Sequence, residues 1–290
     1  MKQLTIISGK GGTGKTTIAA AFASLAENAV IADCDVDAAD MHLILNPEII
    51  ETIDFYGLKE AYIDSSLCIQ CGLCKENCRF DAITDDIKID SFECEGCGVC
   101  VHICPEGAIT MVERKAGEAY LSKTRFGPMA HAKLSVGEEA SGKLVAFVRE
   151  NSRNLAERYG KDLIIIDGPP GTGCSVIASI AGVDMVAVVT EPSVSGIHDL
   201  ERVLGVASHF HIPAVVCINK YDINEENTHI IEDYCGDNGI DVVGKLPFSR
   251  IPTEAMMQEK TVMEYSGNEL SGEFSEKLKD MWGNVMRSLN

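Results

Sequence analysis

The chain has 290 residues, of which 46% are hydrophobic, and a formal net charge of −19 at pH 7. This length suits one large domain or two smaller ones, and the apolar fraction is that of an ordinary globular protein. The excess of carboxylates excludes a general nucleic-acid binder, which needs clustered Lys and Arg. Because no run of about 18 apolar residues and no secretion signal is found, we expect no membrane span and a cytoplasmic location.

A glycine-rich stretch near the N-terminus has the pattern of a phosphate-binding loop. Residues 4–7 predict a buried strand and residues 18–26 a helix, with the pattern G-x-x-x-x-G-K-T between them. Backbone N–H groups and the helix N-terminus favour phosphate there. Lys15 is expected to reach the β- and γ-phosphates, and Thr16 to bind Mg²⁺. The expected nucleotide-binding residues of this loop are Gly9, Lys10, Gly11, Gly12, Thr13, Gly14, Lys15, Thr16 and Thr17.

A second lysine, Lys10, directly follows the first glycine of the loop. The loop therefore resembles the deviant phosphate loop of the MinD/ParA/Mrp superfamily of ATPases, which includes the nitrogenase iron protein. The resemblance implies that ATP is held between two subunits, either of a homodimer or of a heterodimer with a paralogous ATPase. It also implies that Lys10 acts on the nucleotide of the other subunit.

Three carboxylates come directly after apolar runs that predict buried strands. Asp33 and Asp35 follow residues 29–32, and Asp167 follows residues 163–166. Ligands of parallel α/β sheets bind at the carboxyl ends of the strands, so these side chains are expected to face the nucleotide. The resemblance implies that Asp35 activates the attacking water and that Asp33 and Asp167 support Mg²⁺. From the residues alone, helix capping or a solvated strand end remains open for Asp33 and Asp35.

Eight of the twelve cysteines lie between residues 68 and 104, in two copies of the run C-x-x-C-x-x-C-x-x-x-C. This run is typical of bacterial ferredoxins, in which the fourth cysteine of each run binds the other cluster. Two zinc sites are the alternative, but structural zinc prefers two separated cysteine pairs. We therefore expect two [4Fe–4S] clusters. Cluster A would be held by Cys68, Cys71, Cys74 and Cys104, and cluster B by Cys94, Cys97, Cys100 and Cys78.

The C-terminal half predicts two more buried strands, at residues 183–192 and 213–220, separated by a helix. Residues 219–222 have the letters N-K-x-D of the guanine-reading motif of GTPases, but the deviant phosphate loop favours ATP. The resemblance implies that Asn219 contacts the base and that the segment containing Pro247 closes over it. His131 is expected to be a structural or surface residue, and Cys174 a packed thiol, with a subunit-bridging metal as its alternative. A helix at residues 274–285 is expected to pack on the core.

These patterns predict an α/β fold, in which a doubly wound, mostly parallel sheet contains an inserted ferredoxin-like domain. The expected domains are residues 1–63 with 111–290, and residues 64–110. Residues 41–63 are expected to form a short helix and a linker, and residues 111–135 extended strands. The expected function is an ATPase that couples nucleotide state to the clusters and delivers electrons to a redox partner. The alternative is a carrier of the Mrp type, which passes clusters to an acceptor protein.

Overall fold

The protein is described by a computed structural model that covers residues 1–138, 140–267 and 269–290, with side chains at 269 and 270 excepted. Its strands form one nine-stranded sheet in the order β3-β4-β5-β2-β6-β1-β7-β8-β9. The strands are β1 Lys2–Ser8, β2 Ala29–Asp33, β3 Glu48–Ile63, β4 Ile109–Thr124, β5 Gly127–Leu134, β6 Leu163–Pro170, β7 Met185–Thr190, β8 Ala214–Asn219 and β9 Asp241–Leu246. Every pairing from β5 through β9 is parallel.

Helices separate most consecutive strands along the chain, as a doubly wound fold requires, whereas β4 and β5 follow each other directly. They are α1 Lys15–Leu25, α2 Met41–Leu45, α3 Leu73–Glu76, α4 Val99–Ile103, α5 Ser141–Tyr159, α6 Cys174–Ile180, α7 Val194–His209, the 3-10 turn η1 Tyr221–Ile223, α8 Glu225–Asp237, α9 Ile251–Met256 and α10 Glu269–Leu289. The prediction of an α/β fold with a mostly parallel sheet is confirmed.

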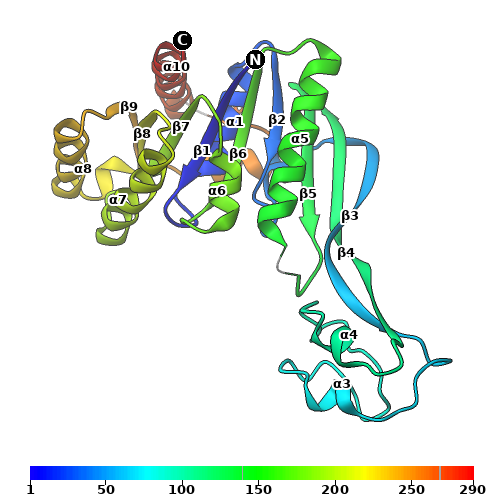
Figure 1. Ribbon diagram of the computed structural model, residues 1–290. Helices are drawn as coiled ribbons and strands as arrows, with labels where there is room; N and C mark the ends of the chain where they lie inside the picture. Colours follow the sequence, from blue (N-terminus) through cyan, green and yellow to red (C-terminus); the bar gives the residue numbers. More distant parts are fainter. Residues whose placement is uncertain (139, 268) are drawn as a thin grey trace. The chain divides into compact units, whose positions relative to one another are not determined.

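Helices cover both faces of the sheet (Figure 1). Strand β1 shows why, since its side chains alternate between the two faces. Leu4 and Ile6 are fully buried in the core that includes α1 and α10. Thr5 points the other way and donates a hydrogen bond to the carbonyl of Ser179 in α6, at 3.1 Å. A strand buried on both faces reads as a continuous apolar run, which is the pattern seen in the sequence.

Helix α10 packs on this core as predicted. Phe274, Leu278, Met281 and Val285 recur at helical spacing and are all at least 96% buried. The ring of Trp282 lies 5.0 Å from that of Phe22 in α1. Across the described ranges, no helix has the length and apolarity that crossing a bilayer requires.

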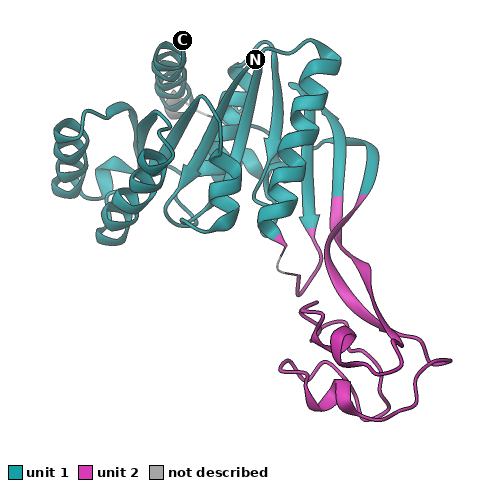
Figure 2. Cartoon of the chain, in the orientation of Figure 1, with its two compact units in different colours: residues 1–53, 119–133, 141–290 teal, residues 54–118, 134–140 magenta. Residues whose placement is uncertain are grey.

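The chain divides into two compact units, which Figure 2 shows in different colours. The larger unit contains residues 1–53, 119–133 and 141–290, and the smaller contains residues 54–118 and 134–140. The cysteine-rich segment that we expected at residues 64–110 lies inside the smaller unit. Strands β3 and β4 each begin in one unit and end in the other, so both connections of the cysteine-rich segment run along neighbouring strands.

The prediction of a linker before the cysteines is wrong, because residues 48–63 form strand β3. This strand lies at the edge of the sheet, and the side chains of its first five residues are exposed. An edge strand with little burial lacks the apolar alternation by which strands are recognised. The extended strands predicted between residues 111 and 135 are present as β4 and β5.

His131 is a buried structural residue, which is one of the two roles, structural or surface, that its sequence context left open. It lies in β5, its Nε2 is 2.8 Å from the hydroxyl of Ser122, and its ring lies 5.0 Å from that of Tyr120. Burial, with a smaller contribution from His42, lowers the pKa of His131 to about 4, from its ordinary value of 6.5. The imidazole is therefore neutral at neutral pH.

This lowered pKa predicts an acid-dependent loss of stability. Between pH 6.5 and pH 4 the unfolded chain binds a proton at residue 131 that the folded chain does not. The free energy of unfolding therefore decreases as the pH is lowered through this window. The shift corresponds to about 3 kcal/mol over that window. The variant His131→Gln cannot take up this proton. Its free energy of unfolding should therefore decrease by about 3 kcal/mol less than that of the wild type over the same window. Urea unfolding of both proteins across the window measures the difference, and parallel curves would contradict the prediction.

Candidate nucleotide site and cysteine module

The phosphate loop joins β1 to α1 and has a backbone that requires glycine at two places. Gly12 and Gly14 have φ values of 77° and 92°, in the left-handed region. A Cβ on Gly14 would also lie 2.4 Å from the side-chain nitrogen of Asn219. Helix α1 then begins at Lys15 with no acidic residue in its first turn, so nothing there competes with a phosphate for the free N–H groups.

Lys15 lies among the three carboxylates that the sequence analysis singled out. Its ammonium donates a hydrogen bond to Asp167 Oδ1 at 2.7 Å and lies 3.5 Å from Asp35 Oδ2. Burial disfavours the charged ammonium, but the fields of Asp167, Asp35 and Asp33 outweigh it and raise the pKa of Lys15. The lysine is therefore charged in a site from which water is largely excluded.

Asp33 and Asp167 are paired positions on the neighbouring parallel strands β2 and β6, and both side chains are 99% buried. One oxygen of each carboxylate, Oδ2, has no hydrogen-bond partner among the described residues. Burial, followed by the charge of Asp167, raises the pKa of Asp33 well above its ordinary value. Buried carboxylate oxygens without partners are the ligands that Mg²⁺ prefers, directly or through its water shell. The residues therefore fit a magnesium ion beside Thr16, whose hydroxyl lies 3.4 Å from the Lys15 ammonium.

Lys10 is engaged within its own chain. Its ammonium lies 2.7 Å from Glu191 Oε1 and donates hydrogen bonds to the hydroxyls of Ser193 and Ser195, at 2.9 and 2.8 Å. Lys220 binds the other oxygen of the same carboxylate at 2.8 Å. Although partial burial opposes ionisation, these two cations hold the pKa of Glu191 below its usual range.

Glu191 and the two serines were not singled out in the sequence. Their position gave one usable signal, since they directly follow the carboxyl end of β7, at the edge of the sheet where ligands bind. Their pairing with Lys10, which lies more than 180 residues away in the chain, has no local signature.

The expected base-contacting residues lie at the ends of β8 and β9. Asn219 pairs with Leu246 in the sheet register, and Pro247 follows directly. The amide of Asn219 donates a hydrogen bond to the carbonyl of Thr13, at 2.7 Å. Asp222 accepts one from the backbone N–H of Phe248, at 2.6 Å. The two strand ends are thereby tied to the phosphate loop and to the segment after β9.

The eight clustered cysteines line two separate cavities in the smaller unit. One is lined by Cys68, Cys71, Cys74 and Cys104, and the other by Cys78, Cys94, Cys97 and Cys100. Each set joins three cysteines of one run to the fourth of the other. None of the twelve cysteines, all of which lie in the described ranges, forms a disulfide.

The two cysteine runs, residues 68–78 and 94–104, together form what we call the cysteine module. They resemble each other in backbone conformation as well as in sequence. Gly72 and Gly98 cap α3 and α4 with φ values of 79° and 74°, each directly before a helix that carries the third cysteine of its run. Cys104 Sγ accepts a hydrogen bond from the N–H of Ala108 at 3.3 Å, and Cys68 Sγ accepts one from that of Gln70. Burial raises the pKa of the Cys74 and Cys100 thiols, and the neighbouring thiols of the same run add to the effect.

Apolar residues beneath the cysteines form a small core of their own. Ala61, Ile83 and Ile109 are buried there, with five of the eight cysteines packed in or against the cluster. Within the described ranges, no group of three or more His, Cys, Asp or Glu side chains converges on a point that would suit a single metal ion.

Comparison with known proteins agrees with the nucleotide-site geometry. Residues 4–262 match the profile of the CobQ/CobB/MinD/ParA nucleotide binding domain. The chain belongs to this nucleotide-binding family. It is 38% identical over 231 residues to the uncharacterized protein MJ0578 of Methanocaldococcus jannaschii, covering 78% of this chain and 80% of that one. It is 22% identical over 209 residues to the septum site-determining protein MinD of Bacillus subtilis, covering 70% of this chain and 58% of MinD.

Solved structures of MinD and McdA share the fold. The cell division ATPase MinD of Pyrococcus furiosus superposes with a TM-score of 0.59 at 15% identity, covering 99% of both chains. MinD of Pyrococcus horikoshii, solved with Mg-ADP, gives 0.59 at 16% identity and covers 98% of this chain and 95% of its own. McdA of Cyanothece in complex with ATP, carrying the substitution D38A, gives 0.58 at 16% identity, with 99% and 96% covered. At these identities the likeness concerns the fold.

Proposed function

We propose that this chain is an ATPase that carries two [4Fe–4S] clusters and couples the nucleotide state of a dimer to them, with ATP-gated electron transfer as its output. The observation that carries the proposal is the division of eight thiols into two cavities of four, in a chain of a nucleotide-binding family. Cysteine thiolates in sets of four are the ligands of such clusters. The clusters would supply one-electron redox chemistry, and the thiols named for each cavity would hold them.

On the nucleotide side, each residue has a role that its surroundings support. The N–H groups of the loop from Gly9 to Thr17 bind the phosphates, and Lys15 moves from Asp167 to the β- and γ-phosphates. Asp35 orients the attacking water, while Thr16, Asp33 and Asp167 hold Mg²⁺. The metal would neutralise charge on the transferred phosphoryl group.

We favour ATP over GTP as the substrate. The preference rests on the second lysine of the loop, Lys10, by which the loop resembles that of the MinD/ParA/Mrp ATPases. Asn219 and Pro247 then remain the base contacts, at the ends of β8 and β9.

The proposed active form is a dimer of this chain, or of this chain with a paralogous ATPase, in which Lys10 reaches the nucleotide of the other subunit. The contacts of Lys10 with Glu191, Ser193 and Ser195 then represent a resting state that must open first. Glu191 is the only one of these three partners whose side chain forms an ion pair with Lys10.

Weakening the resting contact should therefore activate the enzyme. We expect Glu191→Gln to raise steady-state ATP hydrolysis about two- to fivefold, because a partly exposed ion pair contributes on the order of 0.5–1 kcal/mol. Glu232→Gln, which removes the ion pair between Glu232 of α8 and Lys245 of β9, serves as the matched control and should leave the rate unchanged. A slower Glu191→Gln enzyme would show that Glu191 acts in the hydrolysis step itself.

Anaerobic purification with iron and sulfide counts tests the proposed function most directly. We expect about eight iron atoms and eight sulfides per chain, and an absorbance or EPR signal that changes when ATP is added. Zinc in place of iron, or spectra and partner binding identical with and without ATP and ADP, would overturn the proposal.

The second candidate is a cluster carrier of the Mrp type, with an acceptor protein as partner. The exposure of Cys71 and Cys97, one in each cavity, favours it, because an acceptor's thiols must reach the cluster. Incubation with an apo-ferredoxin separates the two candidates. Clusters that move to the apo-protein identify a carrier, whereas clusters that stay bound and cycle between redox states identify an electron-transfer protein.

A further inference from the structure

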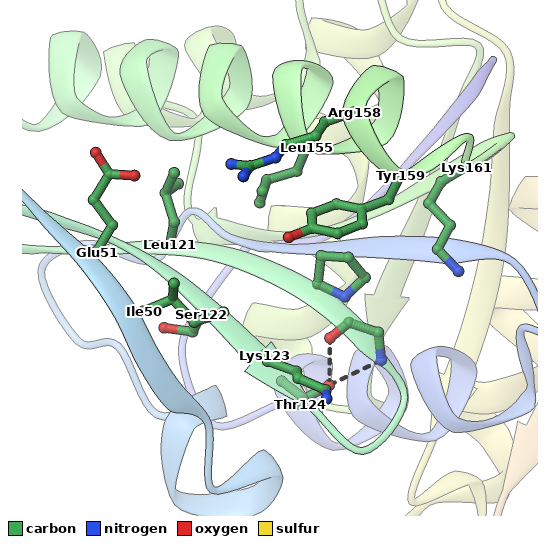
Figure 3. Close-up of a pocket in the computed structure, with 12 residues that line it drawn as sticks. Ile50, Glu51, Leu121, Ser122, Lys123, Thr124, Leu155, Arg158, Tyr159 and Lys161 are labelled. Carbon is green, nitrogen blue, oxygen red and sulfur yellow. Dashed lines mark hydrogen bonds between the residues drawn. The ribbon is translucent and has the colours of Figure 1, made fainter.

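A cavity of about 410 Å³ lies in the larger unit, apart from all the residues assigned above (Figure 3). It is formed by the start of β3, the end of β4, the start of β5 and the C-terminal end of α5. Its volume falls within the range of about 300–1,000 Å³ that small-molecule sites occupy.

The walls of this cavity are largely apolar. Ile50 and Leu121 come from the strands, Pro128 from the start of β5, and Leu155 and the ring of Tyr159 from the helix. Leu155 is 95% buried, whereas Ile50 is 64% exposed, so the cavity has a closed floor and an open mouth. A ligand with an apolar body would cover this exposed surface and remove it from water.

The polar groups of the floor already have partners. The buried hydroxyl of Ser122 is hydrogen-bonded to His131, whose imidazole is neutral. Thr124 donates to the carbonyl of Gly127 at 2.9 Å and accepts from its N–H at 3.2 Å, as the dashed lines in Figure 3 show. A ligand's polar head therefore has to be bound by the charged side chains around the cavity.

Those charged side chains are mostly cations. Lys123, Arg158 and Lys161 line the cavity together with a single carboxylate, Glu51, in a chain of net charge −19. None of the four forms an ion pair with another side chain in the described part of the chain. The guanidinium of Arg158 lies 5.6 Å from the centre of the Tyr159 ring, and both extend from α5 toward the strands. A surplus of positive charge beside an apolar wall attracts organic anions.

We propose that this cavity binds a small organic carboxylate, with its apolar body against Leu121, Leu155 and Tyr159 and its carboxylate on Arg158. The planar guanidinium binds both oxygens of a carboxylate at once. Glu51, at the same cavity, disfavours a ligand with more than one negative charge. The site shares no residue with the phosphate loop or with the two cysteine-lined cavities.

Binding of 1-naphthylacetate to the full-length protein tests the proposal, with 1-naphthylacetamide as the uncharged probe of the same shape. By titration calorimetry, we expect the acid to bind with a dissociation constant below about 1 mM and the amide about tenfold more weakly. Arg158→Gln should weaken the acid about tenfold and leave the amide unchanged. Arg287→Gln is the matched control, because Arg287 lies in the last turn of α10 as Arg158 does in that of α5, and it should change neither.

A second variant tests the location without touching the charges. Leu121→Phe places a larger side chain in the wall and should weaken the acid and the amide alike. Circular dichroism confirms that each variant is folded. The proposal is overturned if the wild-type protein binds no 1-naphthylacetate, if acid and amide bind equally, if Arg287→Gln weakens the acid as much as Arg158→Gln, or if Leu121→Phe leaves both affinities unchanged.

Discussion

Removing Cys68 and Cys104 together should leave one of the two proposed clusters intact, although the two residues belong to different cysteine runs. Both line the same cavity, so the double variant Cys68→Ala/Cys104→Ala damages one ligand set only. Iron should fall from about eight to about four atoms per chain. The variant Cys94→Ala/Cys104→Ala, by contrast, removes one ligand from each cavity and should lose nearly all of its iron.

Iron and sulfide counts on anaerobically purified protein distinguish these outcomes. The control is Cys174→Ala, which should keep all of the iron because this residue lies at the start of α6, outside both cavities. The prediction that Cys174 is a packed thiol is wrong, since its side chain is exposed. If each run held its own cluster, the two double variants would exchange results. Such a reversal would refute the interleaved ligand sets while leaving the presence of clusters standing.

Replacing Lys15 should nearly abolish ATP hydrolysis. Its ammonium is the charge closest to the three carboxylates of the site and is proposed to neutralise the transferred phosphoryl group. Removing one such preorganised charge costs about 10²–10³-fold in rate. We expect this loss for Lys15→Ala in an assay of phosphate release, with the iron content unchanged.

A loss of folding must be separated from this loss of chemistry, because Lys15→Ala also leaves Asp167 without its buried partner. Lys15→Arg retains the positive charge beside Asp167, and its wider planar head cannot take the place of an ammonium in the narrow loop. It should therefore fold and still hydrolyse ATP far more slowly. Lys277→Ala, on the exposed face of α10, should behave as wild type. Undiminished hydrolysis by both Lys15 variants would remove the lysine from the mechanism.

Most of the sheet could be predicted from the sequence, because β1, β6, β7 and β8 are largely buried and each contains a run of mostly apolar residues. The edge of the sheet could not. Strand β3 carries exposed Glu48 and Glu51, and its extended form depends on pairing with β4, which follows some fifty residues later in the chain. A strand whose formation depends on pairing with another strand is difficult to recognise from its own residues.

The same distinction applies to the candidate site. The acidic residues at the strand ends could be placed near the phosphate loop, because the fold class fixes where strands end. The pairs that they form could not be predicted. Lys15 meets Asp167 across 152 positions of sequence, and the contact between Lys10 and Glu191 depends on how β7 ends relative to the loop. The cavity beside Arg158 is assembled from four segments and was not foreseen.

Strands β3 and β4 are hydrogen-bonded neighbours, and residues 64–108 leave the sheet on one and return on the other. The two ends of this long excursion are therefore held together by the sheet itself. Since bringing distant ends together is the main entropic penalty of a long loop, an insertion at this hairpin tip costs the parent fold little. During evolution, a whole segment such as residues 64–108 can be gained, lost or exchanged at such a tip without changing the register of any other strand.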